Sequence, residues 1–291
     1  MSATTNTTQR EQEDFLIRIT NLSKIFPSPK GVCGECLELS GARVDSSICP
    51  KCQSVVGVNS VNLTLKSGEV LGIVGESGSG KSTLLQLLYQ DTKASSGEVY
   101  IRDFSPHKNT LEANLNELSL LRNHIMSMIY QNPRLGLNYF FSAGGNIAEK
   151  ILLKGCRNYE SIREQALYFL EQTQIPTSRI DAYPDVFSGG QQQRIQISKA
   201  LAAKPKILLL DEPTTGLDLS VQAKILDLIK ALQKSLGFAM IVVSHDLGVI
   251  KHLTDLCIVM KNGQIVEQGL SDQVLQDPQH AYTQLLVSSI L

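Results

Sequence analysis

Residues 75–83 read GESGSGKST, and this stretch decides the fold of the chain. It matches the pattern G-x-x-x-x-G-K-[ST], follows an apolar run at 69–74 and precedes LLQLLYQ, which has the composition of a helix. A strand, a glycine-rich loop and a helix in this order form a phosphate-binding loop, because glycines let backbone N–H groups close around phosphate oxygens at a helix N-terminus. An ordinary turn rich in glycine and serine is the alternative, but it would not require the flanking strand and helix. We therefore predict a nucleotide-binding protein.

The phosphate-binding loop also predicts individual contacts. We expect the Lys81 ammonium to reach the β- and γ-phosphates of ATP and the Ser82 hydroxyl to ligate Mg²⁺. The other ATP contacts expected from the loop are Gly75, Ser77, Gly78, Gly80 and Thr83. ATP and Mg²⁺ are accordingly the predicted cofactors.

Composition and charge limit the possible partners. The 291 residues include 27 Lys and Arg against 28 Asp and Glu, and the formal net charge of −1 gives no general attraction for nucleic acid or an anionic membrane. No apolar run approaches the roughly 20 residues of a membrane-spanning helix, and the polar N-terminus lacks the apolar segment of a secretory signal. We expect a cytoplasmic protein without a nucleic-acid partner, and any membrane role would depend on separate subunits.

Apolar runs and helical patterns alternate along the chain. They predict strands at 15–20, 61–66, 69–74, 97–101, 206–212, 239–245 and 255–260, and a helix at 220–236. This order predicts an α/β fold with a parallel sheet, to which an antiparallel β subdomain and a helical subdomain are attached. The expected limits are a disordered lead at 1–14, one domain at 15–291 and, within it, a helical subdomain at about 110–186.

Two carboxylates end the apolar run LLLDEP at 208–213. Asp211 is expected to bind Mg²⁺, directly or through water, and Glu212 to act as general base on the water that attacks the γ-phosphate. Acidic residues after a strand also occur as helix N-caps. The phosphate-binding loop upstream favours the catalytic interpretation.

A second anion-binding motif, FSGGQQQR, occupies residues 187–194. A serine and two glycines at the start of a helix offer a hydroxyl and backbone N–H groups to a phosphate, although alone they would indicate only a helix N-cap. The motif stands between a phosphate-binding loop and a strand that ends in Asp-Glu, and it resembles the LSGGQ signature of ATP-binding-cassette ATPases. The resemblance implies that Ser188, Gly189, Gly190 and Gln191 contact ATP.

Further motifs of the same family occur in the family's order along most of the chain. Gln131 in IYQNP resembles the glutamine that contacts Mg²⁺ and water, and His245 in VVSHD resembles the switch histidine that contacts the γ-phosphate. Asp218 ends TTGLD, which resembles the D-loop, and the resemblance implies that it contacts ATP. Phe26 corresponds to the aromatic residue that stacks on adenine, with an ordinary core phenylalanine as the alternative. The resemblance implies an ATP hydrolase with the fold of a P-loop NTPase, including a RecA-like parallel sheet.

The resemblance also implies a head-to-tail homodimer in the ATP-bound state. The phosphate-binding loop and Asp211-Glu212 of one protomer would face Ser188 and Gly190 of the other, with ATP between them. ATP closes such a dimer and hydrolysis reopens it, so that the conformational cycle drives a partner.

Three segments indicate which partner is driven. They are SAGGNI at 142–147, IPTSRID at 175–181 and DPQHAYTQLLVSSIL at 277–291. Together they resemble the cassette subunit of bacterial carbon–phosphorus lyase systems, which degrade phosphonates and in which the cassette docks on a soluble enzyme core. An ATPase subunit of an oligopeptide, dipeptide or nickel importer, acting on membrane permeases, is the main alternative, because such subunits end in a similar segment. A cassette protein of translation or DNA repair is a third possibility.

Four cysteines form two C-x₂-C pairs, at Cys33, Cys36, Cys49 and Cys52. This is the spacing of a metal ribbon, and four thiolates suit a structural Zn²⁺. An iron–sulfur centre and a metal-free insert are the alternatives. Paired disulfides are not expected, because a cytoplasmic location disfavours them. The expected insert spans 31–57, departs from the family pattern and is a candidate docking element. The remaining cysteines, Cys156 and Cys257, belong to no pattern.

Overall fold

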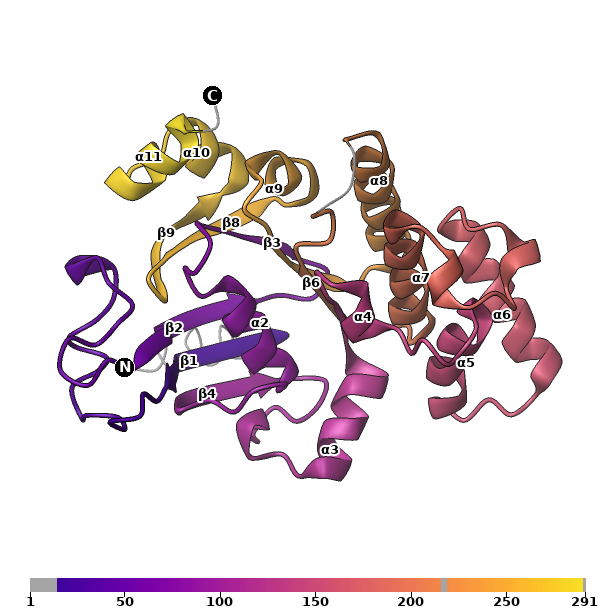
Figure 1. Ribbon diagram of the computed structural model, residues 1–291, viewed down its shortest axis with the longest axis horizontal. Helices are drawn as coiled ribbons and strands as arrows, with labels where there is room; N and C mark the ends of the chain where they lie inside the picture. The colour runs from indigo at the N-terminus through magenta and orange to yellow at the C-terminus, as the bar shows by residue number, and fades with distance from the viewer. Residues whose placement is uncertain (1–14, 216–218, 290–291) are drawn as a thin grey trace, which may run out of the picture. The chain divides into compact units, whose positions relative to one another are not determined.

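The structure, a computed structural model, describes residues 15–215 and 219–289. The chain divides into two compact units, one made of Met1–Leu115 with His245–Leu291 and one made of Asn116–Ser244. The predicted disordered lead at 1–14 lies outside the described residues. Figure 1 labels the strands and helices of both units.

The first unit contains a three-stranded antiparallel sheet in the order β2-β1-β4. Its strands are β1 (Ile17–Phe26), β2 (Val55–Leu65) and β4 (Ser96–Ile101). Ile17 is buried and pairs with Leu65 on one side and Ile101 on the other, as the alternation of apolar residues predicts. β1 and β2 run further than that alternation indicated, because they stay paired as far as Phe26 and Val55.

The connection between β1 and β2, residues 27–54, is the Cys₄ insert. All of these residues are described, and they form one short 3₁₀ helix, η1 (Ala42–Val44), together with isolated backbone bridges. In Figure 1 the insert is the indigo loop beyond the ends of β1 and β2. Little regular structure is available to hold the insert in shape.

A second group of strands in the first unit consists of β3 (Val70–Val74), β8 (Leu256–Lys261) and β9 (Gln264–Leu270). β3 is parallel to β8, and β8 forms an antiparallel hairpin with β9. The hairpin turns at Asn262 and Gly263, whose φ angles of 45° and 81° suit a tight two-residue turn. β9 was not predicted, because most of its side chains are only partly buried and show no clear alternation.

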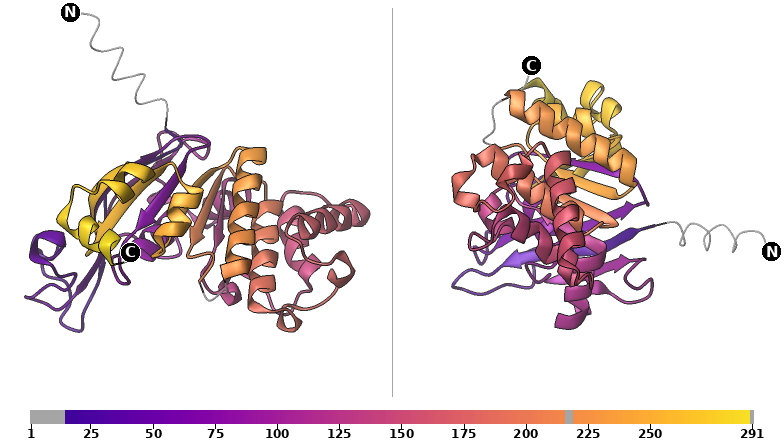
Figure 2. Two further views of the ribbon diagram at one scale, coloured as in Figure 1. Left: turned by 90° about the horizontal axis from the view of Figure 1, so that it is seen from above. Right: turned by 90° about the vertical axis from the view of Figure 1, so that its right-hand side faces the viewer.

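Four α-helices lie wholly within the described part of the first unit. They are α2 (Lys81–Tyr89), α9 (Leu247–Leu253), α10 (Ser271–Gln276) and α11 (Ala281–Ser288), with a 3₁₀ helix, η2 (Thr110–Glu112), after β4. α10 packs against β8, β9 and α9 (Figure 2). α10 therefore lies on the same strands that form the β8–β9 hairpin.

The second unit contains three parallel strands in the order β5-β6-β7. They are β5 (Met126–Ile129), β6 (Ile207–Asp211) and β7 (Ala239–Val243), and every residue in them is buried. Continuous apolar runs are typical of strands covered on both faces. β5 was not predicted, because its sequence MSMI is short and contains a single β-branched residue.

Helices form the rest of the second unit. They are α3 (Leu115–Leu120), η3 (Leu121–Ile125), α4 (Pro133–Gly136), α5 (Ala143–Leu153), α6 (Tyr159–Gln172), η4 (Thr177–Arg179), η5 (Pro184–Val186), α7 (Gly189–Ala202) and α8 (Leu219–Leu236). α5, α6 and α7 pack against one another (Figure 1). In the described parts of both units, no helix combines the length and the apolar character needed to cross a membrane.

Candidate nucleotide and metal sites

The phosphate-binding loop joins β3 to α2 within the first unit. Gly75, Gly78 and Gly80 have φ angles of 151°, 84° and 103°, in the region that favours glycine. A side chain at Gly75 would collide with the Met260 carbonyl oxygen, and one at Gly80 with the Gly57 carbonyl oxygen. Gly75 and Gly80 are therefore required by close backbone packing as well as by the turn, and Gly78 by its φ angle alone.

Lys81 is buried inside this loop. Its side chain is 4% exposed, and its Nζ donates to the carbonyl oxygens of Gly75 at 2.6 Å and Glu76 at 2.8 Å. The loop thus combines a buried ammonium group with a helix N-terminus, and both favour a bound phosphate. The other predicted contacts in the loop are exposed at Ser77 and Gly78 and half-buried at Ser82 and Thr83.

Phe26, the last residue of β1, lies next to the phosphate-binding loop. A side chain built on Gly57 would meet Phe26 Cε2 at 2.8 Å and Thr83 Cγ2 at 3.2 Å, so these three residues converge. The phenylalanine is 38% exposed, and the Lys24 ammonium lies 5.0 Å from the ring centre. An exposed ring beside the first turn of α2 suits adenine stacking better than it suits a role in the core.

In the second unit, Asp211 and Glu212 stand at the end of β6, and Asp211 is 6% exposed. Glu212 has a φ of 45°, which is uncommon for a residue with a side chain, and its N–H donates to the Val243 carbonyl oxygen at 2.9 Å. Glu212 Oε2 accepts hydrogen bonds from Gln131 Nε2 at 2.9 Å and from Thr215 Oγ1 at 2.8 Å. The second unit thus brings together the predicted base and the predicted Q-loop glutamine.

The signature motif forms the N-terminus of α7. Ser188 is the N-cap, its Oγ accepts from the Gln191 N–H at 3.4 Å, and its own N–H donates to Gln191 Oε1 at 3.1 Å. This reciprocal arrangement is a capping box, and it occupies the Gln191 side chain. Ser188 and Gly189 are exposed and Gly190 is half-buried. A helix N-terminus and a hydroxyl group are therefore accessible to an anion.

Of the two remaining predicted ATP contacts, the structure describes only His245. His245 is exposed and directly precedes Asp246, the N-cap of α9, whose Oδ1 accepts from the Gly248 N–H at 2.8 Å. Asp218 lies outside the described residues. Its predicted role stays a prediction.

The four cysteines of the insert converge on one point. Neighbouring Sγ atoms lie 3.4 to 3.5 Å apart, and all four lie within 4.8 Å of one another. A tetrahedral ion with metal–sulfur bonds of about 2.3 Å places its sulfurs roughly 3.8 Å apart. A disulfide would need a sulfur–sulfur distance of about 2.05 Å. A multi-iron cluster would separate the cysteine sulfurs further, because several irons lie between them. The spacing therefore fits a single ion.

The surroundings of the cysteines shift their ionisation in opposite directions. Burial raises the pKa of the Cys36 thiol to about 12, whereas hydrogen bonding with Ser54 lowers the pKa of Cys52 to about 5. Four thiolates at this separation would repel one another unless a cation neutralises them.

The apolar core of the insert is small. It consists of Cys36, Cys49, Cys52 and Val56, with Ile25, Cys33, Leu37 and Leu39 packed against it. Half of these side chains are the cysteines themselves. A core of this size stabilises little on its own, so a bound metal would supply much of the folding energy of the insert.

Two of the segments that resemble lyase cassettes meet in the second unit. The Gly144 N–H donates to the Ile180 carbonyl oxygen at 2.7 Å, and a side chain on Gly144 would meet Ile180 Cγ1 at 2.5 Å. Asn146 is 0% exposed, and its Nδ2 donates to the carbonyl oxygens of Asn138 and Phe141. Packing therefore accounts for the small and polar residues of SAGGNI.

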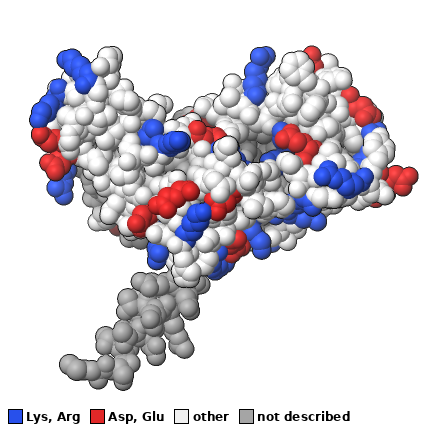
Figure 3. All heavy atoms as spheres, turned by 90° about the horizontal axis from the view of Figure 1, so that it is seen from below, with Lys and Arg blue, Asp and Glu red and all other residues white. Residues whose placement is uncertain are grey.

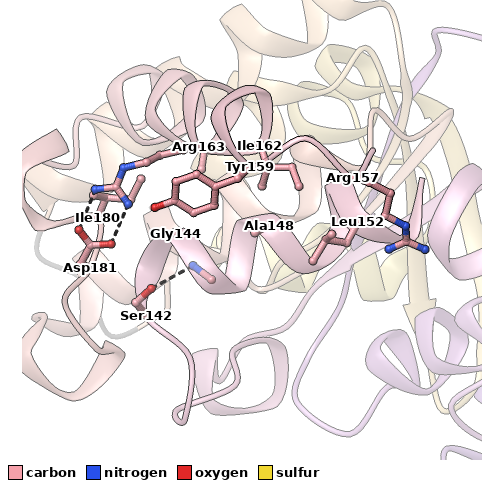
Figure 4. A pocket seen from close by; sticks show the side chains of 12 residues that line it. Ser142, Gly144, Ala148, Leu152, Arg157, Tyr159, Ile162, Arg163, Ile180 and Asp181 are labelled. Atoms are coloured by element: carbon pink, nitrogen blue, oxygen red, sulfur yellow. Dashed lines mark hydrogen bonds and ion pairs between the residues drawn. The ribbon is translucent and has the colours of Figure 1, made fainter. Parts of the chain in front are cut away.

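The same two segments line a cavity of about 390 Å³ (Figure 4). Ser142 and Ala148 line it beside Tyr159 of α6. Arg163 and Asp181 form a two-pronged ion pair at its edge, with N–O distances of 2.9 and 2.7 Å. The cavity is a candidate contact surface for a partner.

Sequence reasoning missed the residues that support the phosphate-binding loop from a distance. Tyr282 Oη accepts a hydrogen bond from the Glu76 N–H at 3.0 Å, and the Gly263 N–H donates to the Ser79 carbonyl oxygen at 2.9 Å. The dipeptide Asn-Gly at 262–263 is a hairpin signal that could have revealed β9. Nothing in the sequence links Tyr282 to the loop.

Comparison with known proteins defines the class. The ABC transporter family profile matches residues 58–215, more than half of the chain. The chain therefore belongs to the ABC transporter family, and it is an ABC-type ATPase, as its motifs predicted.

Three relatives illustrate which members of this class the chain is similar to. The ATP-binding protein PhnK of Escherichia coli (strain K12), named for phosphonates utilization, is 48% identical over 235 residues, which cover 81% of this chain and 92% of PhnK. The oligopeptide transport ATP-binding protein OppF of Lactococcus lactis subsp. lactis (strain IL1403) is 40% identical over 81% of this chain and 73% of OppF. The dipeptide transport ATP-binding protein DppF of Haemophilus influenzae is 34% identical over 97% of this chain and 80% of DppF.

Solved structures agree with this class. The ATP-binding cassette MJ0796, solved as a dimer in a post-hydrolysis state with ADP and phosphate, matches with a TM-score of 0.73 and 29% identity over 88% of this chain and 98% of MJ0796. CbiO1 of Clostridium perfringens, part of an ABC transporter complex, matches with a TM-score of 0.71 and 26% identity over 91% of this chain and 92% of cbiO1. The predicted fold class, an ABC nucleotide-binding domain of the P-loop NTPase type, is confirmed.

Proposed function

We propose that the chain hydrolyses ATP through the residues that its motifs mark. Lys81 holds the β- and γ-phosphates, Ser82 and Asp211 hold Mg²⁺, and Glu212 takes the proton of the attacking water. The hydrogen bond between Gln131 Nε2 and Glu212 Oε2 carries this proposal, because it orients the carboxylate and brings the two motifs together within one unit. His245 contacts the γ-phosphate, and Phe26 stacks on adenine.

The proposed working form is a head-to-tail homodimer closed by ATP. Ser188 and the N-terminus of α7 are exposed, so the signature motif is available to a second protomer. The dimeric state of MJ0796, with 29% identity to this chain, supports the same assembly. ATP hydrolysis then opens the dimer and transmits movement to a partner. We place this activity in the cytoplasm, where ATP is available and thiols stay reduced.

The partner we propose is the soluble core of a carbon–phosphorus lyase system. The observation that carries this proposal is the 48% identity with PhnK over 92% of the length of PhnK. A peptide importer is the second candidate, and the 40% identity with OppF supports it. A nucleic-acid partner is less favoured, because acidic and basic side chains are interspersed on the face shown in Figure 3.

Affinity capture from cells that degrade phosphonates tests the proposed partner. The wild type is expected to retain soluble lyase subunits, and Ala148→Arg to reduce this capture at least fivefold, because an arginine fills the cavity of Figure 4. Glu171→Arg is the control, since Glu171 is exposed on α6 and does not line that cavity. The ATPase rate of all three isolated proteins should agree within twofold. Retention of membrane permeases in place of soluble subunits would support the importer.

We further propose that the four cysteines of the insert bind one structural Zn²⁺. The close approach of the Sγ atoms supports a single ion over an iron–sulfur cluster, and four protein ligands leave no open position for catalysis.

Elemental analysis is expected to find about one zinc per chain, and Cys33→Ser with Cys36→Ser to remove it. The insert should then become accessible to proteases, while the second unit keeps its fold. Cys156→Ser is the matched control, because Cys156 lies outside the cluster. A brown protein that absorbs near 400 nm would assign the site to an iron–sulfur centre instead of zinc (absorption in roughly that range is typical of such centres). A metal-free wild type with four reactive thiols would contradict both.

A further inference from the structure

We propose that the Cys₄ insert positions the phosphate-binding loop, so that metal bound by the four cysteines raises the affinity of the loop for nucleotide. The inference deepens the proposed ATP and zinc sites and rests on both. Two independent series of contacts, each through the β8–β9 hairpin, lead from the insert to the loop. All of these residues belong to the first unit.

The first series passes through Asn59. This residue of β2 is 3% exposed, and its Nδ2 donates to the carbonyl oxygens of Leu37 at 2.8 Å and Ser40 at 3.2 Å in the insert. The Asn59 N–H donates to the Gly263 carbonyl oxygen at 2.8 Å. The Gly263 N–H in turn donates to the Ser79 carbonyl oxygen in the phosphate-binding loop at 2.9 Å. One buried side chain and one turn residue thus join the insert to the loop.

The backbone segments along this series are closely packed. Gly263 has a φ of 81°, and a side chain there would lie 3.2 Å from the Gly57 carbonyl oxygen and 3.3 Å from the Asn59 nitrogen. The same Gly57 oxygen abuts Gly80 of the phosphate-binding loop. Because these backbones are in contact, a shift of the Asn59 segment must move the loop or open a gap.

The second series passes through Tyr282. Asp45 of the insert pairs with Lys261 at 2.7 Å, and the Lys261 ammonium lies 5.0 Å from the centre of the Tyr282 ring. Tyr282 Oη accepts the hydrogen bond from the Glu76 N–H at 3.0 Å. Gln264 adds a parallel contact, since its Oε1 accepts from the Ala42 N–H at 2.9 Å. The hydrogen bond from Glu76 fixes the first peptide after Gly75, where the loop leaves β3.

The first series is linked to the metal through the backbone of the insert that it contacts. Leu37 directly follows the ligand Cys36, and the Ser40 Oγ donates to the Cys36 carbonyl oxygen at 2.7 Å. Because half of the small core of the insert consists of the cysteines, loss of the metal would release the carbonyl groups that Asn59 binds. Asn59 would then be a buried amide without these partners, which favours rearrangement.

Nucleotide affinity of isolated, monomeric protein tests the inference, with a fluorescent ATP analogue as the probe. Asn59→Ala is expected to raise the dissociation constant five- to tenfold, the size of one or two lost hydrogen bonds. Asp45→Asn, which removes a more exposed pair, should raise it about twofold. Asn62→Ala and Glu35→Gln are matched controls: Asn62 is exposed on the same strand, and Glu35 pairs with Lys51 inside the insert. Both controls should bind nucleotide like the wild type.

Tyr282 is expected to act as a positioning residue. Tyr282→Phe removes only the hydroxyl group, and it should raise the KM for ATP about fivefold while kcat at saturating ATP stays within twofold. A merely structural role would lower the melting temperature without this separation of KM from kcat.

Reciprocity supplies a second readout that does not depend on any variant. If metal tightens nucleotide binding by a given factor, nucleotide must tighten metal binding by the same factor. Competition with a chromophoric zinc chelator should therefore show five- to tenfold tighter zinc binding with saturating ATP analogue than without it.

The outcomes separate the inference from the proposals on which it rests. A wild type that binds no nucleotide overturns the proposed ATP site, and one that binds nucleotide but no metal overturns the metal part of the inference. Equal nucleotide affinity of wild type, Asn59→Ala and Asp45→Asn, with equal zinc affinity in the presence and absence of nucleotide, overturns the inference alone. The ATP and zinc sites would then stand as independent sites.

Discussion

The variant Glu212→Gln is expected to hydrolyse ATP about 10² to 10⁴ times more slowly than the wild type while it still binds ATP. Glutamine has the shape of glutamate and keeps an oxygen that can accept from Gln131 Nε2 or Thr215 Oγ1, so the end of β6 should not rearrange. It cannot take a proton from the attacking water. Phosphate release measures the rate, and size-exclusion chromatography with ATP should show the variant trapped as a dimer.

Glu149→Gln is the matched control for this prediction. Glu149 is a carboxylate of the same unit that pairs with Lys199 at 3.0 Å on neighbouring helices, so its loss should leave the rate within twofold. If Glu212→Gln turns over ATP like the wild type, another group activates the water.

The second large effect is expected for Ser188→Arg. An arginine at the exposed start of α7 should prevent a second protomer from closing on ATP, so that hydrolysis falls at least a hundredfold. Nucleotide binding by the monomer should remain within twofold of wild type, because the signature acts on the nucleotide of the other protomer. Light scattering with and without ATP measures closure, and equilibrium binding measures affinity.

A mixture of variants makes this test specific. Ser188→Arg mixed with Lys81→Ala should recover activity, with at most one working site per heterodimer. In that site the first variant supplies the intact phosphate-binding loop and the second supplies the intact signature motif. Asn158→Arg is the control for the lost helix cap, because Asn158 caps α6 through the Ser161 N–H at 2.9 Å and lies outside the signature. Loss of nucleotide binding by Ser188→Arg alone would argue against a site shared between protomers.

Most of the fold could be predicted because its core strands have strong patterns. The buried runs of β3, β6 and β7 are continuous, and the phosphate-binding loop fixes the order of strand, loop and helix. β5 and β9 escaped prediction for a physical reason. β5 has four residues, and β9 is partly exposed along its length, so neither shows a period that can be distinguished from a loop.

Some residues of the candidate site could be predicted from the sequence and others could not. Lys81, Glu212 and the four cysteines lie in short local motifs whose spacing reflects the ligand, so the sequence reveals them. Asn59 and Tyr282 act through contacts made by residues far apart in the chain, such as the bond from the Glu76 N–H to Tyr282 Oη. Such contacts depend on tertiary packing, and no local pattern records them.

The first unit is assembled from both ends of the chain, and this has a consequence for the order of events during synthesis. The Ala42 N–H bonds to Gln264, 222 positions later, and 129 residues, Asn116–Ser244, emerge from the ribosome between the two parts of the unit. At roughly 5 to 20 residues per second this interval lasts about 6 to 26 seconds, during which β2 lacks its contacts with β9. The four cysteines span only Cys33–Cys52 and need no later segment to meet. We therefore expect the metal-bound Cys₄ insert to be the first long-lived structure in the nascent chain. It would form before β8 and β9 are synthesised.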